Sequence, residues 1–226
     1  MIWRRSILAA GLASLVLFLA PARAQTSGDA VGVQGVKNIR TLKEIRGEGV
    51  VRQRWDMSCG AAALSTVLTY DFKDNTPETA IVVWILHRVD PVRVQARGGF
   101  SLLDLKHFAQ ARGYHAEGFS GMSMEELAAQ KTSVITPIRL KGFDHFVVVK
   151  GVVDGRVILA DPGFGNLTMK VPQFQKLWKN GILFIVQPPD DRMIVEKRIT
   201  TASRLLPDET VIFRSIGIST PSNALY

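Results

Sequence analysis

The sequence predicts an α+β fold, in which helices from the first half pack on an antiparallel β-sheet formed by the second half. Up to about Lys131, apolar residues recur at helical spacing behind residues that cap helices. After that point the texture changes to short runs rich in Val and Ile, separated by turn-forming residues. Segregated helices and strands are typical of the α+β class.

Four helices are expected in the first half. The first, capped by Ser58, spans Cys59 to about Tyr70, so that Cys59 lies at a helix start. The second is expected behind Thr76 as cap, with Pro77 at its first helical position. The other two begin with patterns that resemble capping boxes: Ser101-Leu-Leu-Asp104, with a helix ending at Gly113, and Ser123-Met-Glu-Glu126.

Four main strands are expected in the second half. Asp154-Gly155 lies between two of them and predicts a tight hairpin, because Asp and Gly tolerate the positive φ that such turns demand. The predicted strands are residues 133–140, 145–153, 156–160 and 182–187.

The N-terminus is predicted to be a secretory signal peptide, residues 1–24. Arg4-Arg5 precedes an apolar run from Ile7 to Ala20, and Ala22-Arg23-Ala24 forms a small-x-small cleavage site. A membrane anchor is the alternative, but the run is shorter than the roughly 20 residues that a spanning helix needs. We therefore expect export to the periplasm and no stable membrane insertion after cleavage. Beyond it we expect a loosely ordered lead-in or edge strand at 25–48, a folded domain at 49–187 and an extension at 188–226.

The charge of the chain gives little support to nucleic-acid binding. The net charge of +8 falls to +5 once the three arginines of residues 1–24 are removed, since that segment holds no acidic residue. The remaining Lys and Arg are scattered, without the cluster that phosphate binding requires. We expect no nucleic-acid partner.

Cys59 is the only cysteine in the sequence, so it cannot form an intramolecular disulfide. A buried inert thiol or an intermolecular bridge are the plain alternatives to a reactive role. Its expected position favours reactivity, because the unsatisfied amides and the macrodipole at a helix N-terminus stabilise a thiolate. A catalytic thiol also needs an imidazole to take its proton and a carboxylate to orient that imidazole.

His145 and Asp161 are the candidates for these two groups. His145 opens an apolar strand, where a polar ring at the rim of a sheet is expected to have a specific partner. Asp161 ends the next strand, directly before Pro162-Gly163, although a purely turn-forming role is the alternative. The other three histidines suit surface positions: His87, His107 and His115.

The register of the hairpin adds a condition. A strict two-residue turn would place Asp161 opposite Val148, on the other face of the sheet from His145. We therefore predict a bulge, an odd-length turn or a departure from the pleat at Pro162.

Three segments carry a family resemblance. Gln53-Arg-Trp-Asp-Met-Ser-Cys59-Gly-Ala-Ala-Ala-Leu, together with His145-Phe-Val-Val-Val and Leu159-Ala-Asp161-Pro-Gly, resembles the motifs of the double-glycine cysteine peptidases, which trim leader peptides from bacteriocins and other exported polypeptides. Gly99-Phe-Ser-Leu-Leu-Asp-Leu-Lys106 is similar to a segment of stand-alone exported members, including those of the Fap functional-amyloid secretion system. The resemblance covers roughly residues 51–186.

The resemblance implies a papain-like fold and four site residues. Cys59 would be the nucleophile, His145 the general base and acid, Asp161 the orienting carboxylate and Gln53 a side-chain donor to the oxyanion; no cofactor or metal is implied. A signal peptide without a Walker sequence favours a periplasmic substrate. We expect a cysteine endopeptidase that cleaves exported polypeptides after Gly-Gly, in support of secretion or amyloid assembly. An exported polypeptide is the expected partner, and a secretion pore is a candidate docking partner.

Other functions stay open at this point. The fold could hold leader-like segments without cutting them, as an accessory or chaperone of a secretion system. The same Cys, His and Asp could bind zinc, or could transfer an acyl group to an amine instead of water. Gly98-Gly99 could suggest self-processing, but paired glycines more often mark a turn before a capped helix.

Overall fold

The computed structural model describes residues 41–140, 142–190 and 206–208, and the part from Arg40 onward forms one unit. The predicted signal peptide, the lead-in up to residue 40 and most of the C-terminal extension lie outside the described residues. No helix of the described part has both the length and the hydropathy to cross a bilayer. The elements are α1 (Leu42–Gly47), α2 (Cys59–Thr66) with a π-helical turn (Val67–Asp71), α3 (Glu78–Leu86), α4 (Pro91–Arg97), α5 (Leu102–Ala111), β1 (His115–Phe119), α6 (Met124–Ala128), β2 (Val134–Leu140), β3 (Phe143–Val153), β4 (Arg156–Asp161), β5 (Gly165–Lys170), α7 (Val171–Leu177) and β6 (Leu183–Gln187).

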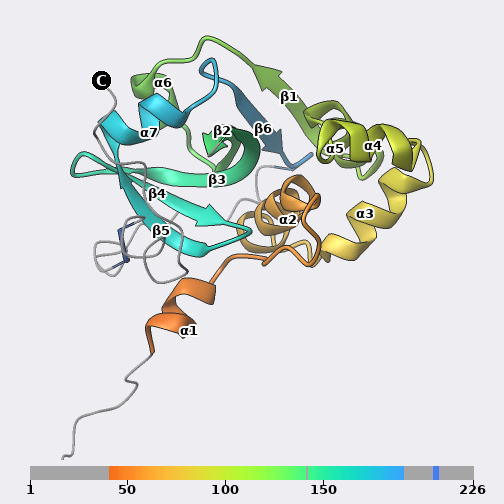
Figure 1. The fold of residues 1–226 in the computed structure, drawn as a ribbon, viewed down its shortest axis with the longest axis horizontal. Coiled ribbons are helices and arrows are strands. Elements are labelled where there is room, and N and C mark those ends of the chain that lie inside the picture. The colour runs from red at the N-terminus through yellow and green to blue at the C-terminus, as the bar shows by residue number, and fades with distance from the viewer. Residues whose placement is uncertain (1–40, 141, 191–205, 209–226) are drawn as a thin grey trace, which may run out of the picture. The chain divides into compact units, whose positions relative to one another are not determined.

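The strands form one six-stranded antiparallel sheet in the order β1-β6-β2-β3-β4-β5. Helices α2 to α5 precede all of these strands in the chain, and Figure 1 shows them gathered beside the sheet. The predicted α+β arrangement, with N-terminal helices packed on a C-terminal antiparallel sheet, is confirmed.

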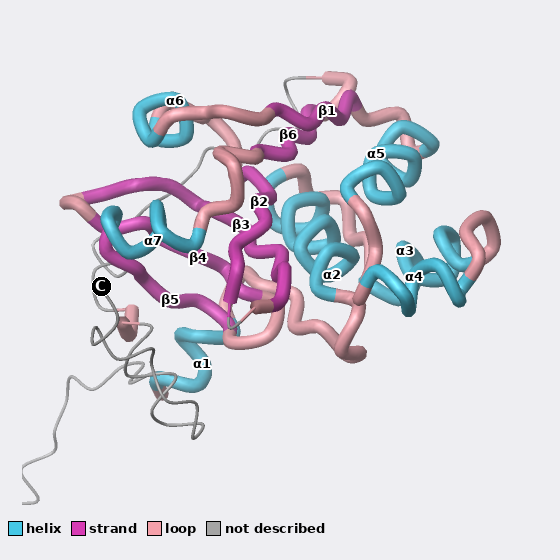
Figure 2. Tube along the Cα trace, turned by 45° about the horizontal axis from the view of Figure 1, so that its top comes forward, coloured by secondary structure: helices cyan, strands magenta, loops and turns pink. Residues whose placement is uncertain are grey.

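Each face of the sheet has its own apolar core. On one face, Val148 and Phe184 pack with side chains of α2, α3 and α5, among them Leu64 and Leu105. On the other face, strand residues pack with α6 and with Phe174 of α7. Figure 2 shows α2 between the sheet and helices α3 to α5, so that α2 is enclosed by its neighbours.

Helix α2 is built for close approach. All of its residues are buried, and its first turns are Gly and Ala. A Cβ at Gly60 would lie 3.2 Å from Leu105 Cδ1 and 3.2 Å from Phe146 Cδ2. The absence of a side chain at Gly60 therefore lets the start of α2 sit directly against β3 and α5.

Two of the predicted helix starts are confirmed in detail. The Ser101 side chain accepts from Asp104 N while the Asp104 side chain accepts from Ser101 N, and Ser123 and Glu126 make the same reciprocal pair. Gly113 follows α5 with φ of +87°, as expected of a residue just past a helix end.

Two predicted caps are wrong. Pro77 is extended, with ψ of 148°, so α3 begins one residue later at Glu78, and the Thr76 hydroxyl bonds Asp74 instead of a helix amide. Ser58 stands at the N-cap position of α2, but its side chain makes no capping hydrogen bond. Its hydroxyl is engaged by Trp55 O and Glu78 Oε1.

The end of the predicted lead-in is a helix, which corrects the expectation of a loosely ordered segment or edge strand there. Thr41 and Glu44 form a capping box at the start of α1. Asn166 Nδ2 donates to Ile45 O at 3.2 Å, which ties α1 to β5. At the other end of the domain, Asp208 pairs with Thr168 of β5 through a parallel bridge.

Candidate active site

A β-bulge sets the faces of the β3–β4 hairpin. Val149 pairs with Leu159 and Gly151 with Ile158, which leaves Lys150 as an extra residue on β3. Continuing the register beyond the Val148–Ala160 pair places Asp161 opposite Val147, two positions from His145 and therefore on the same face. The predicted departure from a strict hairpin is confirmed, and a bulge is the form it takes.

The bulge lets His145 and Asp161 meet. His145 Nε2 lies 2.9 Å from Asp161 Oδ1, and only 16% of the imidazole and 4% of the carboxylate side chain are exposed. Asp161 Oδ1 also accepts from Gly163 N at 2.7 Å and from Phe164 N at 3.0 Å. These backbone donors fix the carboxylate, so that it can fix the ring.

Two arginines hold the loop that follows Asp161. Arg46 of α1 donates from Nη2 to Phe164 O at 2.7 Å. Arg52 donates from Nε to Pro162 O at 3.1 Å and from Nη2 to Gly163 O. Burial and the nearby Arg46 lower the pKa of Arg52, and the charge of Asp161 opposes this. The loop carbonyls are thus turned toward cations and the loop amides toward Asp161.

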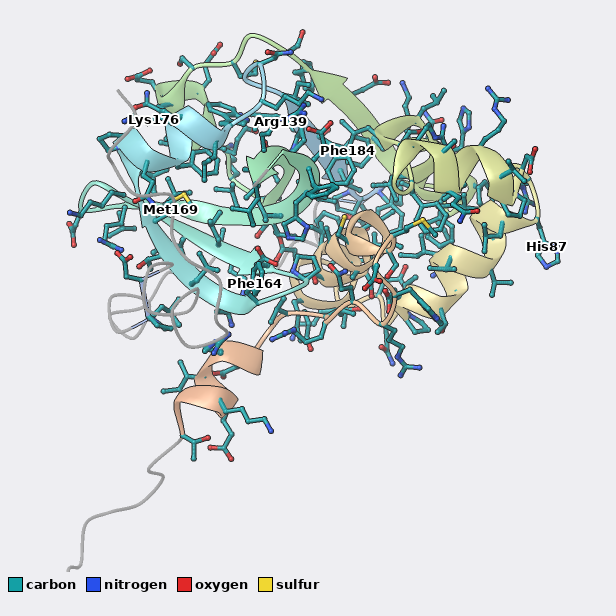
Figure 3. All side chains as sticks on the ribbon, in the orientation of Figure 1. His87, Arg139, Phe164, Met169, Lys176 and Phe184 are labelled. Carbon is teal, nitrogen blue, oxygen red and sulfur yellow. The ribbon has the colours of Figure 1, made fainter. Side chains whose placement is uncertain are left out.

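Cys59 acts on the His145 ring, since its hydrogen bonding and charge are among the causes that raise the pKa of His145. Because Nε2 faces Asp161, Nδ1 is the ring nitrogen left for the thiol. Cys59 is buried, with 8% of its surface exposed, and it begins α2, which packs against β3. The other three histidines are exposed; Figure 3 shows His87 at the far end of α3, whereas Phe164, whose ring is 6.4 Å from that of His145, lies near the sheet.

The surroundings of His145 favour the imidazolium. Burial of the ring opposes protonation, but the charge and hydrogen bond of Asp161, followed by those of Cys59, outweigh it and raise the pKa of His145 to about 10. An imidazole that interacts with both a carboxylate and a cysteine is the arrangement that activates a sulfur nucleophile. The geometry therefore suits nucleophilic attack by sulfur.

A pH dependence of stability follows from this pKa. The folded-state pKa lies above the unfolded value of about 6.5, so the stabilisation is complete below pH 6.5 and is lost as the pH rises toward 10. We expect the urea unfolding free energy of Cys59→Ala, in which the thiol cannot titrate, to fall as the pH rises above 6.5 by at most about 1.4 kcal/mol per pH unit. The fall should end below pH 10, because this variant lacks the contribution of Cys59 to the raised pKa of His145. Adding Asp161→Asn should flatten the curve; equal slopes in the two proteins would contradict the assignment.

Gln53, like His145 and Asp161, faces Gly163, and its amide nitrogen donates within the loop that leads to Cys59. Nε2 is 3.1 Å from Trp55 O, while the buried Oε1 finds no protein donor in the described part of the chain. A Cβ at Gly163 would lie 3.7 Å from Gln53 Oε1 and 3.8 Å from His145 Cε1, so both side chains face Gly163. Its oxyanion role stays a prediction.

Two alternatives can be compared with the geometry. Among residues 41–140, 142–190 and 206–208, no three His, Cys, Asp or Glu side chains are grouped as metal ligands. Gly98 ends α4 in the left-handed region, with φ of +77°, and a Cβ at Gly99 would lie 2.9 Å from Met57 O. The interpretation of this glycine pair as a turn is confirmed, and it packs against the loop that precedes Cys59.

A comparison with protein families accounts for this arrangement. A model of the Peptidase C39 family matches residues 48–191, well over half of the chain. The chain belongs to the peptidase C39 family. The resemblance to double-glycine peptidases drawn from the sequence is confirmed, and with it the papain-like fold.

Relatives and solved structures agree with the C39 assignment. Two proteins named "Probable functional amyloid protease FapD", from Pseudomonas aeruginosa and Pseudomonas fluorescens, are 33% and 32% identical over 150 residues. The match covers 66% of this chain and 65% of each relative, just under two thirds of their length. A double glycine motif protease from an AMS/PCAT transporter, solved with the leader peptide, is 28% identical with a TM-score of 0.51, covering 62% of this chain and 90% of that one. The peptidase domain of Streptococcus ComA, 20% identical with a TM-score of 0.52 over 62% of this chain and 97% of its own, supports the fold alone.

Several residues that shape this C39 site were not anticipated from the sequence. Arg46 and Arg52 reach the Asp161 loop over more than 100 residues of chain, and no local pattern marks such contacts. Glu78 accepts a hydrogen bond from Arg54 N, in the loop that leads to Cys59, and no local pattern marks this contact either. The capping box at Thr41 and Glu44 was a usable signal that the segment containing Arg46 is helical.

Proposed function

We propose that this protein is a periplasmic cysteine endopeptidase that hydrolyses exported polypeptides after a Gly-Gly motif, in support of secretion or functional-amyloid assembly. The observation that carries the proposal is the 2.9 Å contact between His145 Nε2 and Asp161 Oδ1, together with the influence of Cys59, the only cysteine in the sequence, on the pKa of the same ring. Membership of the C39 family supports the peptidase activity itself.

Cys59, His145 and Asp161 act as a triad in the proposed reaction. His145 Nδ1 takes the proton of the Cys59 thiol, and the sulfur attacks the scissile carbonyl carbon. As the C–N bond breaks, the imidazolium returns the proton to the leaving amine and a thioester remains. Water then attacks the thioester and gives a proton to the same nitrogen. As the C–S bond breaks, that proton passes to sulfur, which releases the carboxylic acid product and regenerates the thiol. Asp161 holds the Nε2–H tautomer and the ring plane throughout.

Gln53 would stabilise the oxyanion in this scheme. A side-chain amide aimed at a tetrahedral intermediate is worth about 3–4 kcal/mol where water is excluded. Gln53 and His145 both face Gly163, but Gln53 Nε2 must exchange the Trp55 carbonyl for the oxyanion. Binding of an extended substrate would provide that competing acceptor.

The substrate assignment draws on the relatives. The solved protease with a double glycine motif was captured with the leader peptide, and the FapD relatives are named as functional amyloid proteases. Glycine at both positions before the cut suits a channel too narrow for a Cβ. An exported polypeptide with such a motif is the proposed partner, and docking on a secretion pore is part of the same proposal.

Cleavage of matched peptides tests the proposal. We expect a candidate exported peptide containing Gly-Gly to be cut directly after the motif. Its Ala-Ala counterpart should be cut with a kcat/KM lower by at least about 10–200-fold, since each of the two added methyl groups has an effect of that order in a fitted site. Mass spectrometry of the products gives the cut site and shows whether water or an amine accepts the acyl group. Binding without turnover, together with no labelling of Cys59 by iodoacetamide, would contradict the peptidase and support a peptide-binding accessory instead.

A further inference from the structure

Glu78 is a buried carboxylate that the proposed reaction does not use. It begins α3, and 3% of its surface is exposed. Burying a carboxylate is costly unless its oxygens are well hydrogen-bonded. The hydrogen bonds made by Glu78 within the described chain come from the loop that leads to Cys59 and from no Lys or Arg side chain. The cost of burying this group is therefore offset at the loop.

Glu78 contacts both ends of that loop. Oε1 lies 3.1 Å and Oε2 3.2 Å from Arg54 N, directly after Gln53. Oε1 is also 2.5 Å from Ser58 Oγ, directly before Cys59. One side chain thus joins the residue that follows the proposed oxyanion donor to the residue that precedes the proposed nucleophile.

The loop itself is closed by hydrogen bonds that depend on Ser58. Trp55 N donates to Ser58 Oγ at 3.2 Å, and Ser58 N donates to Trp55 O at 3.1 Å. The single hydroxyl hydrogen of Ser58 cannot serve both Trp55 O at 2.8 Å and Glu78 at 2.5 Å, and the shorter contact favours Glu78. With the hydroxyl turned to Glu78, Trp55 O remains able to accept from Gln53 Nε2, which lies 3.1 Å away.

Glu78 lines a cavity that is separate from Cys59, His145 and Asp161. A cavity of about 500 Å³ is lined by Gln53, Arg54 and Glu78 but by none of Cys59, His145 and Asp161. Glu78 is therefore reached from a side of the loop that the thiol and the imidazole do not line. It touches neither reacting atoms nor the imidazole.

We propose that Glu78 is a positioning residue that fixes the nucleophile loop, residues 53–59, so that Cys59 and Gln53 are held in register with each other. The proposal rests on the proposed peptidase function for its kinetic readout. A carboxylate is required because Arg54 N–H approaches both oxygens, so the amide of Gln would set its own N–H₂ against that donor. Misplacement of a reacting group by about 1 Å can cost about 100-fold in rate.

Glu78→Gln tests the proposal, with Asp104→Asn as its matched control. Asp104 is also a buried carboxylate in the first turn of a helix and accepts a backbone amide, but its partners are Ser101 and Arg97, and no hydrogen bond joins it to residues 53–59. We expect Glu78→Gln to lower kcat by about 10–100-fold with KM within about twofold, and to change the pH profile of Cys59 alkylation by iodoacetamide. Asp104→Asn should lose stability comparably and change neither.

The two readouts separate this proposal from the peptidase proposal. Alkylation reports on the loop whether or not any peptide is cut, so a shifted profile in Glu78→Gln supports the positioning role even if the wild type shows no turnover. Because Ser58→Ala removes the other half of the shared contact, the loss in the double variant should be smaller than the sum of the two single losses. Wild-type kcat and alkylation profile in Glu78→Gln, with only a lowered Tm, would overturn the positioning role.

Discussion

Replacement of Cys59 by Ala should lower kcat/KM for peptide cleavage by about 10⁴-fold or more, because no other group in the chain can form the thioester. The chain has a single cysteine, so no second thiol can substitute. Cys59 is 8% exposed at the start of a fully buried helix, and Ala fits the same space. The loss should therefore fall on kcat, with the melting temperature and peptide affinity close to those of the wild type.

The measurement needs two arms. Turnover is followed by product mass, and binding by titration of a labelled uncleaved peptide into both proteins. In the wild type, a thiol reagent should label one site and abolish turnover in parallel. Residual cleavage by Cys59→Ala within tenfold of the wild type would rule out covalent catalysis by sulfur.

Replacement of His145 by Gln is expected to lower kcat/KM by about 10³–10⁴-fold, since the amide can occupy the place of the ring but cannot take or return a proton. The same variant should slow alkylation of Cys59 at neutral pH, because the imidazolium that stabilises the thiolate is gone. The two effects have one cause and should appear together.

His107→Gln provides the matched control for this prediction. His107 lies on α5 and is exposed, so the same substitution there should leave turnover and alkylation unchanged. If His145→Gln lost turnover while its thiol reacted at the wild-type rate across the pH range, the ring would have another role than activating sulfur.

Much of the fold could be predicted because its signals are local. The reciprocal caps at Ser101 and Ser123 and the turn at Asp154-Gly155 depend on residues three or fewer positions apart, and each appears where the pattern placed it. Helix α4 carried comparable signals, with Asp90 capping Val92 N and Pro91 at the first position, but it was not anticipated.

The remaining elements depend on tertiary context. Strand β5 was not anticipated, although Asn166-Leu-Thr-Met-Lys170 alternates polar and apolar residues as a strand does. Its polar residues Asn166 and Thr168 are buried as well, because they bond α1 and Arg156. The start of α3 was displaced because Ser58 and Arg54 bind Glu78 from another part of the chain. At the site, Cys59 could be predicted as the reactive residue because a thiol at a helix start is chemically distinctive. An irregularity between His145 and Asp161 could also be predicted, but its position at Lys150 could not.

The extra residue at position 150 makes the site sensitive to chain length in an unusual way. Side chains alternate between the two faces of the sheet along β3 and β4, so the number of residues between His145 and Asp161 decides whether both lie on one face. The extra residue Lys150 places them on the same face. Deleting or inserting one residue in the β3–β4 hairpin would place Asp161 on the face opposite His145, although the sequence would still contain all three residues of the proposed triad. Homologues should therefore tolerate length changes here only in pairs, or at the tip where a longer turn can absorb them.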